Sequence, residues 1–439
     1  MCWAEQMTPG TNHRLPASIE TERLILRPWT EEDIPALYEA VDASRERIGA
    51  WLPWVAYYTD RSAAVTFLAQ ARQGWRSGAS LPMAVTERGS GRILGGVGFH
   101  GTIAGAPIDW ERGLFETGYW LREGEEGKGY MREAVRAEIR LVFEHFGGRK
   151  LVIRCDARNA HSRRVAESLG FRLEVHARNQ MRTAAGGLRD TLSFSLLADE
   201  ATALIDAWPT EPFAVSWSDQ EVPPTPDGQD DQEPVPDAAA TFPRPCAIVT
   251  GRLRLRPPTL DDAAALLALF DRSRGSLTRT FPTFRRVTTI DHARTLCAEA
   301  VANADARREF PLLAFTRDTG ELIGGGEIHE VKWDVPAAEI DWWLDDGQTG
   351  RGYATEIGAA QLRFLMEAWS ANRVEVWCEA ANLPSRRVAE RIGFTHEGII
   401  RQEYPGANAP FADYAIASVI PADYERIAPT LPPVHFETD

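Results

Sequence analysis

The sequence GYWLREGEEGKGYMREA, residues 118–134, decides the fold of this chain. Its apolar run 119–121 predicts a strand, and the glycines at 124, 127 and 129 predict a turn. Apolar residues then recur at helical spacing, which predicts a helix from about residue 131 to 146 that ends at Gly147 and Gly148. A glycine turn that leads into a helix leaves backbone N–H groups free at the positive end of the helix dipole. The stretch therefore predicts a phosphate-binding site.

The same stretch occurs a second time, as DWWLDDGQTGRGYATEI at residues 341–357. Gly127-Lys128-Gly129-Tyr130 matches Gly350-Arg351-Gly352-Tyr353 at a shift of 350 − 127 = 223 residues. At the same shift, NAHSRRVAESLGF (159–171) matches NLPSRRVAERIGF (382–394), and upstream TERLILRP (21–28) matches TGRLRLRP (250–257) at a shift of 229 residues. Solenoid repeats have periods of roughly 20–50 residues, so this spacing indicates a duplicated domain.

Composition places the chain among ordinary globular proteins, with 44% hydrophobic and 25% charged residues in 439. The five cysteines form no CxxC pair, which argues against disulfides and zinc and for a reducing compartment. We expect a cytoplasmic protein, because no apolar run of about 18 residues and no secretory signal is present. The net charge of −15 disfavours nucleic-acid binding and suits either a cationic substrate or solubility.

Five segments are predicted along the chain. Residues 1–17 form a disordered extension, 18–208 the first domain, 209–245 a linker rich in proline and acids, 246–425 the second domain and 426–439 a weakly ordered tail. Each domain has the predicted order strand, helix, helix, three strands, helix, strand, helix and two strands. This order indicates a mixed α/β fold, with a ligand expected where a strand ends and a helix begins.

These residues resemble the GNAT superfamily of acetyl-CoA-dependent N-acyltransferases. The motif of that family is Q/R-x-x-G-x-G/A, and both copies keep its two later glycines but have glycine at the first position, at Gly124 and Gly347. The preceding YWL or WWL and the later N-x-x-S-x-x-x-A-E-x-x-G-F resemble the RimJ/RimL branch, which acetylates ribosomal-protein N-termini. The resemblance implies two tandem domains, each a mixed, mostly antiparallel splayed sheet flanked by helices.

The resemblance also implies acetyl-CoA as co-substrate, with no metal. The coenzyme pyrophosphate is expected on the amides of residues 125–131 and 348–354. The residues implied in cofactor binding are Trp120, Leu121, Gly127, Lys128, Gly129, Tyr130, Met131, Asn159, Trp343, Leu344, Gly350, Arg351, Gly352, Tyr353, Ala354, Asn382 and Arg387. The competing interpretations are glycine turns that serve packing, asparagines that only cap helices and arginines on a solvated helix face.

Direct acylation of an amine requires a group that takes the proton of the amine and a group that protonates the leaving thiolate. Candidate bases are Glu116 and Glu339, which correspond between the copies, and Glu327, where the first copy has Gly98. A lone strand glutamate is more often solvated or paired. The resemblance implies that Ser162 and Ser385 lie near the thiol and protonate it. The mismatch at Gly98 predicts two non-identical sites, and if one copy is weak we expect it to be the first.

Aromatic residues cluster where the family binds its acceptor, and they are the predicted substrate contacts: Trp51, Trp54 and Tyr57 in the first copy, Phe281 and Phe284 in the second. Core packing explains them equally well. The expected acceptor is a primary amine, either a protein N-terminus or a small molecule. The two domains are expected to form an intramolecular pseudo-dimer or to stay independent. The alternatives are an acyl-CoA-binding sensor or scaffold without catalysis, and an enzyme that uses another acyl-CoA donor.

Overall fold

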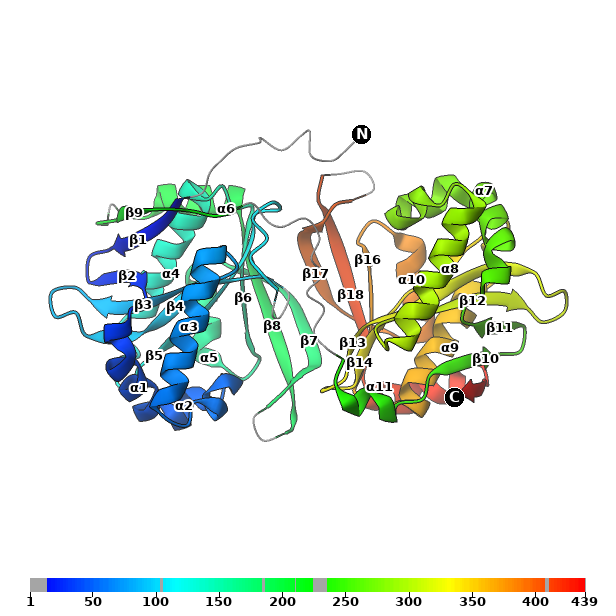
Figure 1. Ribbon diagram of the computed structural model, residues 1–439, viewed down its shortest axis with the longest axis horizontal. Coiled ribbons are helices and arrows are strands. Elements are labelled where there is room, and N and C mark those ends of the chain that lie inside the picture. Colours follow the sequence, from blue (N-terminus) through cyan, green and yellow to red (C-terminus); the bar gives the residue numbers. More distant parts are fainter. Residues whose placement is uncertain are drawn as a thin grey trace. The chain divides into compact units, whose positions relative to one another are not determined.

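The computed structural model describes residues 14–102, 106–183, 186–209, 211–223, 235–406 and 410–438. The chain divides into two compact units. Unit 1 comprises the described residues of Met1–Glu174 and Arg182–Asp230, and unit 2 comprises those of Val175–Met181 and Asp231–Asp439. Figure 1 shows that each unit is built around a sheet with helices packed on it.

Unit 1 is a mixed sheet in the order β9-β1-β2-β3-β4-β5-β6-β8, in which only the β5–β6 pair is parallel among the described pairings. The strands are β1 (Arg14–Glu20), β2 (Leu24–Pro28), β3 (Leu81–Glu87), β4 (Ile93–His100), β5 (Leu114–Leu121), β6 (Lys150–Asp156), β8 (Leu188–Leu197) and β9 (Ala214–Glu221). Strand β7 (Arg172–Arg182) is divided between the units, because its residues Val175–Met181 belong to unit 2. The α-helices are α1 (Ile34–Ala43), α2 (Arg45–Gly49), α3 (Arg61–Ser77), α4 (Tyr130–Arg140), α5 (Ala160–Ser168) and α6 (Ala198–Ala207).

Unit 2 repeats this plan in the order β19-β10-β11-β12-β13, then β14 with β15, then β16-β18-β17, with β14–β16 as the parallel pair. Its strands are β10 (Pro245–Val249), β11 (Leu253–Arg256), β12 (Phe310–Thr316), β13 (Leu322–Lys332), β14 (Ala337–Ile340), β15 (Trp343–Leu344), β16 (Arg373–Glu379), β17 (Thr395–Tyr404), β18 (Ala412–Val419) and β19 (His435–Thr438). Its α-helices are α7 (Ala263–Thr280), α8 (Ile290–Asp305), α9 (Tyr353–Ala368), α10 (Leu383–Ile392) and α11 (Pro421–Ile427). The predicted mixed, mostly antiparallel fold is therefore confirmed.

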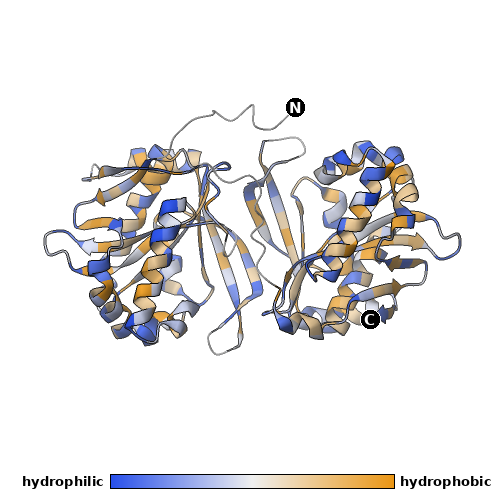
Figure 2. Cartoon of the chain, in the orientation of Figure 1, coloured by the Kyte–Doolittle hydropathy of each residue, from blue (hydrophilic) through white to orange (hydrophobic). Residues whose placement is uncertain are grey.

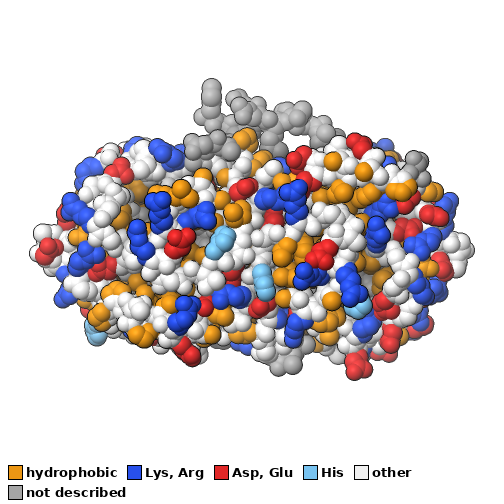
Figure 3. Space-filling model, turned by 180° about the vertical axis from the view of Figure 1, so that it is seen from behind, with side chains coloured by type: hydrophobic (Ala, Val, Ile, Leu, Met, Phe, Trp, Pro, Cys, Tyr) orange, Lys and Arg blue, Asp and Glu red, His pale blue; other side chains and the backbone are white. Residues whose placement is uncertain are grey.

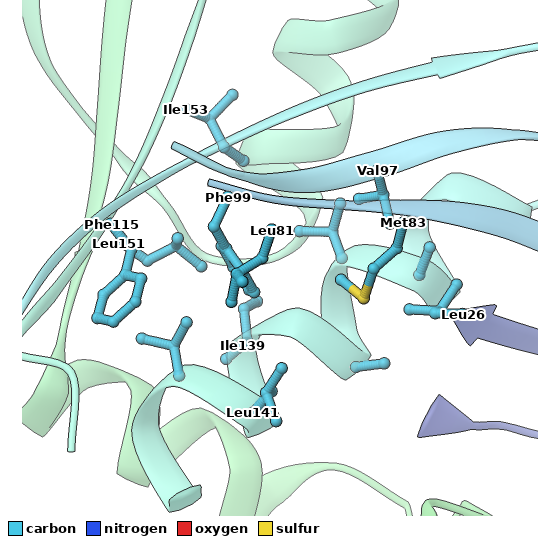
Figure 4. Packing of buried hydrophobic residues seen from close by; sticks show 14 of the residues in the cluster. Leu26, Leu81, Met83, Val97, Phe99, Phe115, Ile139, Leu141, Leu151 and Ile153 are labelled. Atoms are coloured by element: carbon cyan, nitrogen blue, oxygen red, sulfur yellow. The ribbon is translucent and has the colours of Figure 1, made fainter. Parts of the chain in front are cut away.

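Each sheet is covered on both faces, because its strands alternate between two cores. In β3, Met83 and Val85 belong to the core beneath α4, whereas Ala84 packs with α1 and α3 on the other face. Figure 4 shows Ile139 and Leu141, at the end of α4 and just beyond it, against Leu81, Met83 and Phe99 of the sheet. In unit 2, Leu312 and Leu313 of β12 likewise point to the α9 core and the α7–α8 core. Figure 2 shows the matching stripes of apolar and polar residues along the helices.

Three segments differ from the sequence expectation. Strand β1 begins at Arg14, inside the predicted N-terminal extension. Strand β9 lies in the predicted linker and pairs with β1, and β19 lies in the predicted tail and pairs with β10. Each added strand supplies hydrogen-bond partners to a sheet edge that would otherwise be open. The alternation in β9 was hidden by the prolines and acids that follow it. The predicted helix 131–146 also changes character, because a π-helical turn, Leu141–His145, follows α4.

Candidate active site

Both sheets open at the parallel pair. In unit 1, β5 and β6 pair only from Leu114 to Glu116; beyond that point β5 continues along β4 and β6 continues along β8. In unit 2, β14 pairs with β16 from Ala337 to Glu339, after which β15 follows β13 while β16 follows β18. The two strands of each pair therefore diverge, and the backbone edge of the diverging strand that faces the gap forms no ladder. An extended ligand can hydrogen-bond to such an edge.

A glycine cradle follows the diverging strand in each unit. Gly127 and Gly129 have φ of 73° and 83°, and Gly350 and Gly352 have φ of 75° and 81°. This backbone is left-handed and favours glycine, and no atom lies within 4 Å of where a Cβ of Gly127 or Gly350 would stand. The first N–H to bond within α4 belongs to Glu133, which donates to the carbonyl of Gly129. The preceding N–H groups therefore remain available to an anion.

An ion-paired strap, which sequence analysis missed, ties the first hairpin of each unit to its cradle. In unit 1, Glu133 accepts from Thr21 Oγ1 at 2.6 Å and from Arg23 Nε at 2.7 Å, while Arg23 donates to the carbonyl of Lys128 at 2.9 Å. The guanidinium also lies over the ring of Tyr130. The repeated T-x-R of the two hairpins was the available signal, since it recurs beside two cradles.

Unit 2 contains the same strap. Glu356 accepts from Thr250 Oγ1 and from Arg252 Nε, and Arg252 donates to the carbonyl of Arg351 at 3.0 Å. The Arg252 guanidinium lies over Tyr353. Tyr130 and Tyr353 are both among the residues predicted to bind cofactor. Their rings thus help to anchor the arginines that hold the cradle carbonyls.

The other residues predicted to bind cofactor have varied surroundings. Lys128 pairs with Glu125 at 3.0 Å, whereas the side chain of Met131 is buried in the core, so that only its backbone amide belongs to the cradle. Asn159 and Asn382 cap α5 and α10 by accepting from the N–H of Ser162 and Ser385. The remaining residues of this set are exposed at Arg351 and Arg387 and partly buried at Leu121, Leu344 and Ala354. Their contact with a coenzyme stays a prediction.

Trp120 and Trp343 lie over glycines of the neighbouring strand. A Cβ on Gly96 would come within 2.7 Å of Trp120, and a Cβ on Gly325 within 2.8 Å of Trp343. The predicted substrate aromatics pack on these two rings: Trp54 makes an edge contact with Trp120, and Phe284 makes one with Trp343.

The other predicted aromatic residues have different surroundings. Phe281 stacks on Phe284, and the carbonyl of Trp51 accepts from Arg189 at 3.0 Å. Tyr57 is 83% exposed and is therefore not a core residue. Of the alternatives left open by the sequence, packing explains Phe281 and Phe284, and contact of any of these residues with an acceptor stays a prediction.

Acidic side chains gather on one face of the unit 2 sheet at the opening. Glu327 lies on β13, Asp341 between β14 and β15, and Glu339 on β14, where cross-strand pairing places Glu339 beside His329. Burial, reinforced by the charges of Asp341 and Glu309, raises the pKa of Glu327 to about 9. Burial also raises the pKa of Asp341 to about 7, although the Glu327 N–H opposes the shift.

Glu339 and His329 on this face also have shifted pKa values. Burial and the charges of Glu375 and Asp341 raise the pKa of Glu339 well above its usual range. Burial lowers the pKa of His329 to about 4, so this imidazole is neutral near pH 7. Asp341 was not among the predicted site residues; the signal was its charge at the position where the first copy has Gly118.

Unit 1 has a single acid at the matching place. Glu116 accepts from Arg154 Nε at 2.8 Å, and the Arg154 guanidinium also donates to the carbonyl of Thr102. The unit 2 residue that corresponds to Arg154 is Trp377, whose indole N–H donates to Glu375. Of the two candidate bases that correspond between the copies, Glu116 is therefore ion-paired with an arginine and Glu339 is surrounded by acids.

Ser162 and Ser385 lie in the first turn of α5 and α10, the helices that follow β6 and β16. The hydroxyl of Ser162 lies 3.0 Å from the Tyr119 hydroxyl, and Cys155 lies beside it. Burial raises the pKa of the Cys155 thiol to about 11, with the Ser162 hydrogen bond opposing, so this cysteine behaves as a small buried apolar side chain. In unit 2, Trp342 replaces Tyr119 and packs over Gly358, so Ser385 has no tyrosine hydroxyl at this position.

Three further features bear on the kinds of ligand and location: surface charge, helix hydropathy and possible metal ligands. On the face shown in Figure 3, basic and acidic side chains are interspersed. No helix within the described ranges has both the length and the apolar content needed to cross a membrane. Among the described residues, no three His, Cys, Asp or Glu side chains converge as a metal-binding group.

The known proteins to which this chain is similar are acetyltransferases. The model of the acetyltransferase (GNAT) domain family matches residues 23–172 and again residues 252–395. The chain is 28% identical over 113 residues to the uncharacterised N-acetyltransferase YnaD of Bacillus subtilis, which covers 26% of this chain and 65% of that protein. It is 30% identical over 82 residues to the ribosomal-protein-serine acetyltransferase of Escherichia coli, which covers 19% of this chain and 46% of that protein.

Among solved structures, RimJ of Mycobacterium smegmatis in complex with CoA-disulfide has 22% sequence identity and a TM-score of 0.39. The match covers 44% of this chain and 98% of that one.

Proposed function

We propose that this chain, which belongs to the GNAT acetyltransferase family, transfers the acetyl group of acetyl-CoA to a primary amine by direct attack. The amine nitrogen bonds to the thioester carbonyl carbon, the carbon–sulfur bond breaks, and coenzyme A leaves as its thiol. No covalent enzyme intermediate is needed. The chain's contribution is to hold both reactants, to accept a proton from the amine and to supply one to the sulfur.

One observation carries the proposal: in each unit the strand that leaves its parallel partner leads directly into a left-handed glycine cradle at a helix start. An elongated ligand with a pyrophosphate fits this arrangement. Its pyrophosphate takes the free amides before α4 or α9, and its arm lies along the unpaired strand edge toward the acids. The open space above Gly127 and Gly350 leaves room for phosphate oxygens.

Acidic groups at the opening support an amine as the acceptor. A lysine amine has a reference pKa of about 10.4 and a protein α-amine one of about 8, so either arrives mostly protonated at neutral pH. An ionised carboxylate beside the thioester stabilises that cation and accepts its proton. The E. coli relative is named a ribosomal-protein-serine acetyltransferase, which favours a protein as the acceptor, while a small amine fits the same chemistry.

A second function is supported for unit 1 by a specific contact. Because Arg154 already neutralises Glu116, unit 1 has a coenzyme cradle without a free carboxylate at the opening. Acyl-CoA binding without transfer would suit such a site, as would a donor with another acyl group.

The test uses the full chain and two matched variants, Gly129→Val and Gly352→Val. Each replaces a glycine with φ above 80° by a β-branched residue that does not tolerate this conformation. Calorimetric titration of acetyl-CoA is expected to give two sites in the parent chain and one in each variant. Transfer to a panel of primary amines, followed by mass spectrometry of the products, then identifies which cradle supports turnover.

The outcomes separate the possibilities. Transfer that survives Gly129→Val but not Gly352→Val assigns catalysis to unit 2 and binding alone to unit 1. Two binding sites with no transfer to any amine would favour the sensor function. A parent chain that binds no acetyl-CoA would contradict the proposal.

A further inference from the structure

Asp341 occupies an interruption in the strand that borders the unit 2 opening. The β13–β14 and β13–β15 ladders share one register, in which Asp341 would stand opposite Glu327, yet the strand stops at Ile340 and resumes at Trp343. The interruption has a visible cause. The N–H of Glu327 donates to Asp341 Oδ1 at 2.8 Å, and the carbonyl of Asp341 accepts from Gln361 Nε2 of α9 at 2.8 Å.

These contacts fix one end of the carboxylate and leave the other available. The N–H of Asp341 still donates to the carbonyl of Glu327 at 3.1 Å, so both the backbone and Oδ1 are held. In the part of the chain that the structure describes, Oδ2 accepts no hydrogen bond, and the side chain is only partly buried. A carboxylate with one fixed oxygen and one available oxygen is preorganised to take a proton.

The neighbouring acids are less suited to the task. Burial, together with the charges of Asp341 and Glu309, raises the pKa of Glu327 to about 9, so Glu327 stays protonated at neutral pH. The pKa of Glu339 is also raised well above its usual range. Glu375, which stands opposite Glu339 on β16, is ion-paired with Arg373 at 2.5 Å. His329 is neutral there and adds no charge.

We propose that Asp341 is the catalytic base of unit 2, a residue to which neither the motifs nor the first copy points. Its Oδ2 takes one proton from the ammonium group of the acceptor, which frees the nitrogen lone pair to bond to the thioester carbon; the carbon–sulfur bond breaks, the sulfur leaves with its electron pair, and the second proton lost by the nitrogen passes to that thiolate. The proton on Asp341 then passes to solvent. Glu327 is a positioning residue, because its N–H orients Asp341 Oδ1. This inference rests on the proposed function.

The decisive variant is Asp341→Asn in a full chain that also carries Gly129→Val, so that transfer by unit 1 does not mask the effect. Asparagine keeps an oxygen for the Glu327 N–H and removes the basic site. Loss of a general base is expected to lower kcat by about 10²-fold or more. The matched control is Glu339→Gln, which alters the neighbouring acid on the same face.

A pH profile distinguishes a base from a structural role. With an alkyl amine that keeps its proton from pH 5.5 to 8.5, kcat/KM of the Gly129→Val chain should rise with pH and level off near the pKa of Asp341, about 7. Asp341→Asn should lose this break while binding acetyl-CoA as before and melting at the same temperature, and Asp341→Glu should restore part of the rate. A break that persists in Asp341→Asn, with kcat reduced less than threefold, would overturn the inference.

Two further results distinguish a failure of the Asp341 assignment from a failure of the proposed acetyltransferase function. A break that is lost in Glu339→Gln instead would move the base to Glu339 and refute the assignment while leaving amine acetylation intact. A Gly129→Val chain that acetylates no amine, although it binds acetyl-CoA, would remove both the catalytic function of unit 2 and the base.

Discussion

The two units share one backbone plan and differ in the polar groups that fill it. Both have the splayed strands, the left-handed glycines and the Thr–Arg–Glu strap, in which the arginine Nε lies 2.7 Å from the glutamate in each unit. At the opening, however, Gly98, Gly118, Val152 and Arg154 of unit 1 stand where unit 2 has Glu327, Asp341, Glu375 and Trp377. The coenzyme cradle is thus the shared feature, and the acid-rich opening belongs to unit 2.

Packing explains part of this difference. A Cβ on Gly98 would stand 2.5 Å from the carbonyl oxygen of Leu81, so unit 1 cannot hold a glutamate there unless β3 moves. At Gly118 the nearest atom is Nε2 of His100 at 3.3 Å, and an aspartate there requires only a small shift. The comparison teaches that the backbone constrains the cradle tightly, whereas the opening accepts different side chains where the strands leave room.

The largest expected effect comes from breaking the strap in either unit. Glu356→Ala leaves Thr250 Oγ1 and the backbone and side-chain N–H groups of Arg252 without their shared acceptor, and losing these hydrogen bonds to a charged group should cost about 3–5 kcal/mol in total. Glu133→Ala should cost somewhat less, because its side chain is 12% exposed against 9% for Glu356. Denaturant unfolding of the full chain measures both. If neither variant lowers the midpoint, the strap is not a stabilising element.

The next effect is a pH dependence of stability that α4 of unit 1 should show and α9 of unit 2 should not, because Gln361 stands in α9 where α4 has Glu138. Glu138 of α4 is fully buried, its pKa is raised to about 8 by burial, and only Thr117 opposes the shift. Between pH 4.5 and 8 the folded chain keeps a proton that the unfolded chain has lost, so stability falls as pH rises through this window. Glu138→Gln should therefore stabilise unit 1 by about 2–4 kcal/mol at pH 8 and hardly at all at pH 4.5.

The matched variant for this prediction is Gln361→Glu, which introduces the same buried carboxyl into unit 2 at the corresponding position. It should destabilise the chain at pH 8 and not at pH 4.5. Thermal melts at both pH values provide the measurement, and an equal gain from Glu138→Gln at the two pH values would show that the effect is not protonation.

A smaller effect is expected from exchanging Arg154 and Trp377. Arg154→Trp leaves Glu116 without its cation at a buried position, which should cost about 1–2 kcal/mol, since the arginine is itself partly exposed. Trp377→Arg should instead place a cation near Glu339 and lower the pKa of that carboxyl. Chemical denaturation tests the first variant and the pH profile of transfer tests the second. If Arg154→Trp leaves stability unchanged and Trp377→Arg leaves the pH profile unchanged, the residues at positions 154 and 377 do not set the charge of the opening.

The smallest expected effect concerns Tyr119, which has no counterpart in unit 2. Tyr119→Phe removes one buried hydrogen bond to Ser162 and should cost about 1 kcal/mol. If Ser162 protonates the leaving thiolate, transfer by unit 1 should also slow by up to about tenfold, measured in a Gly352→Val chain. Trp342→Phe in a Gly129→Val chain provides the comparison and should not slow transfer through Ser385.

Sequence reasoning predicted the features that depend on local backbone chemistry. The strands beside the glycine turns, the helices after them and the Asn caps at 159 and 382 follow from residues that are close in the chain. It missed β9 and β19, which form because a distant sheet edge needs hydrogen-bond partners. It also missed the strap, because Arg23 and Glu133 are 110 residues apart and neither is unusual alone.

By itself the sequence determined that the protein is a duplicated mixed α/β chain with a glycine turn before a helix in each copy, since periodicity and glycine conformation are local properties. Only the tertiary structure decided which acids meet. Glu327 lies on β13, whereas Glu339 and Asp341 lie on and just after β14, and the pKa values of these three groups depend on mutual distance and burial, which no linear spacing encodes. For the same reason Glu116 and Glu339, which occupy equivalent positions in the sequence, have opposite electrostatic surroundings: an arginine beside one and carboxylates beside the other.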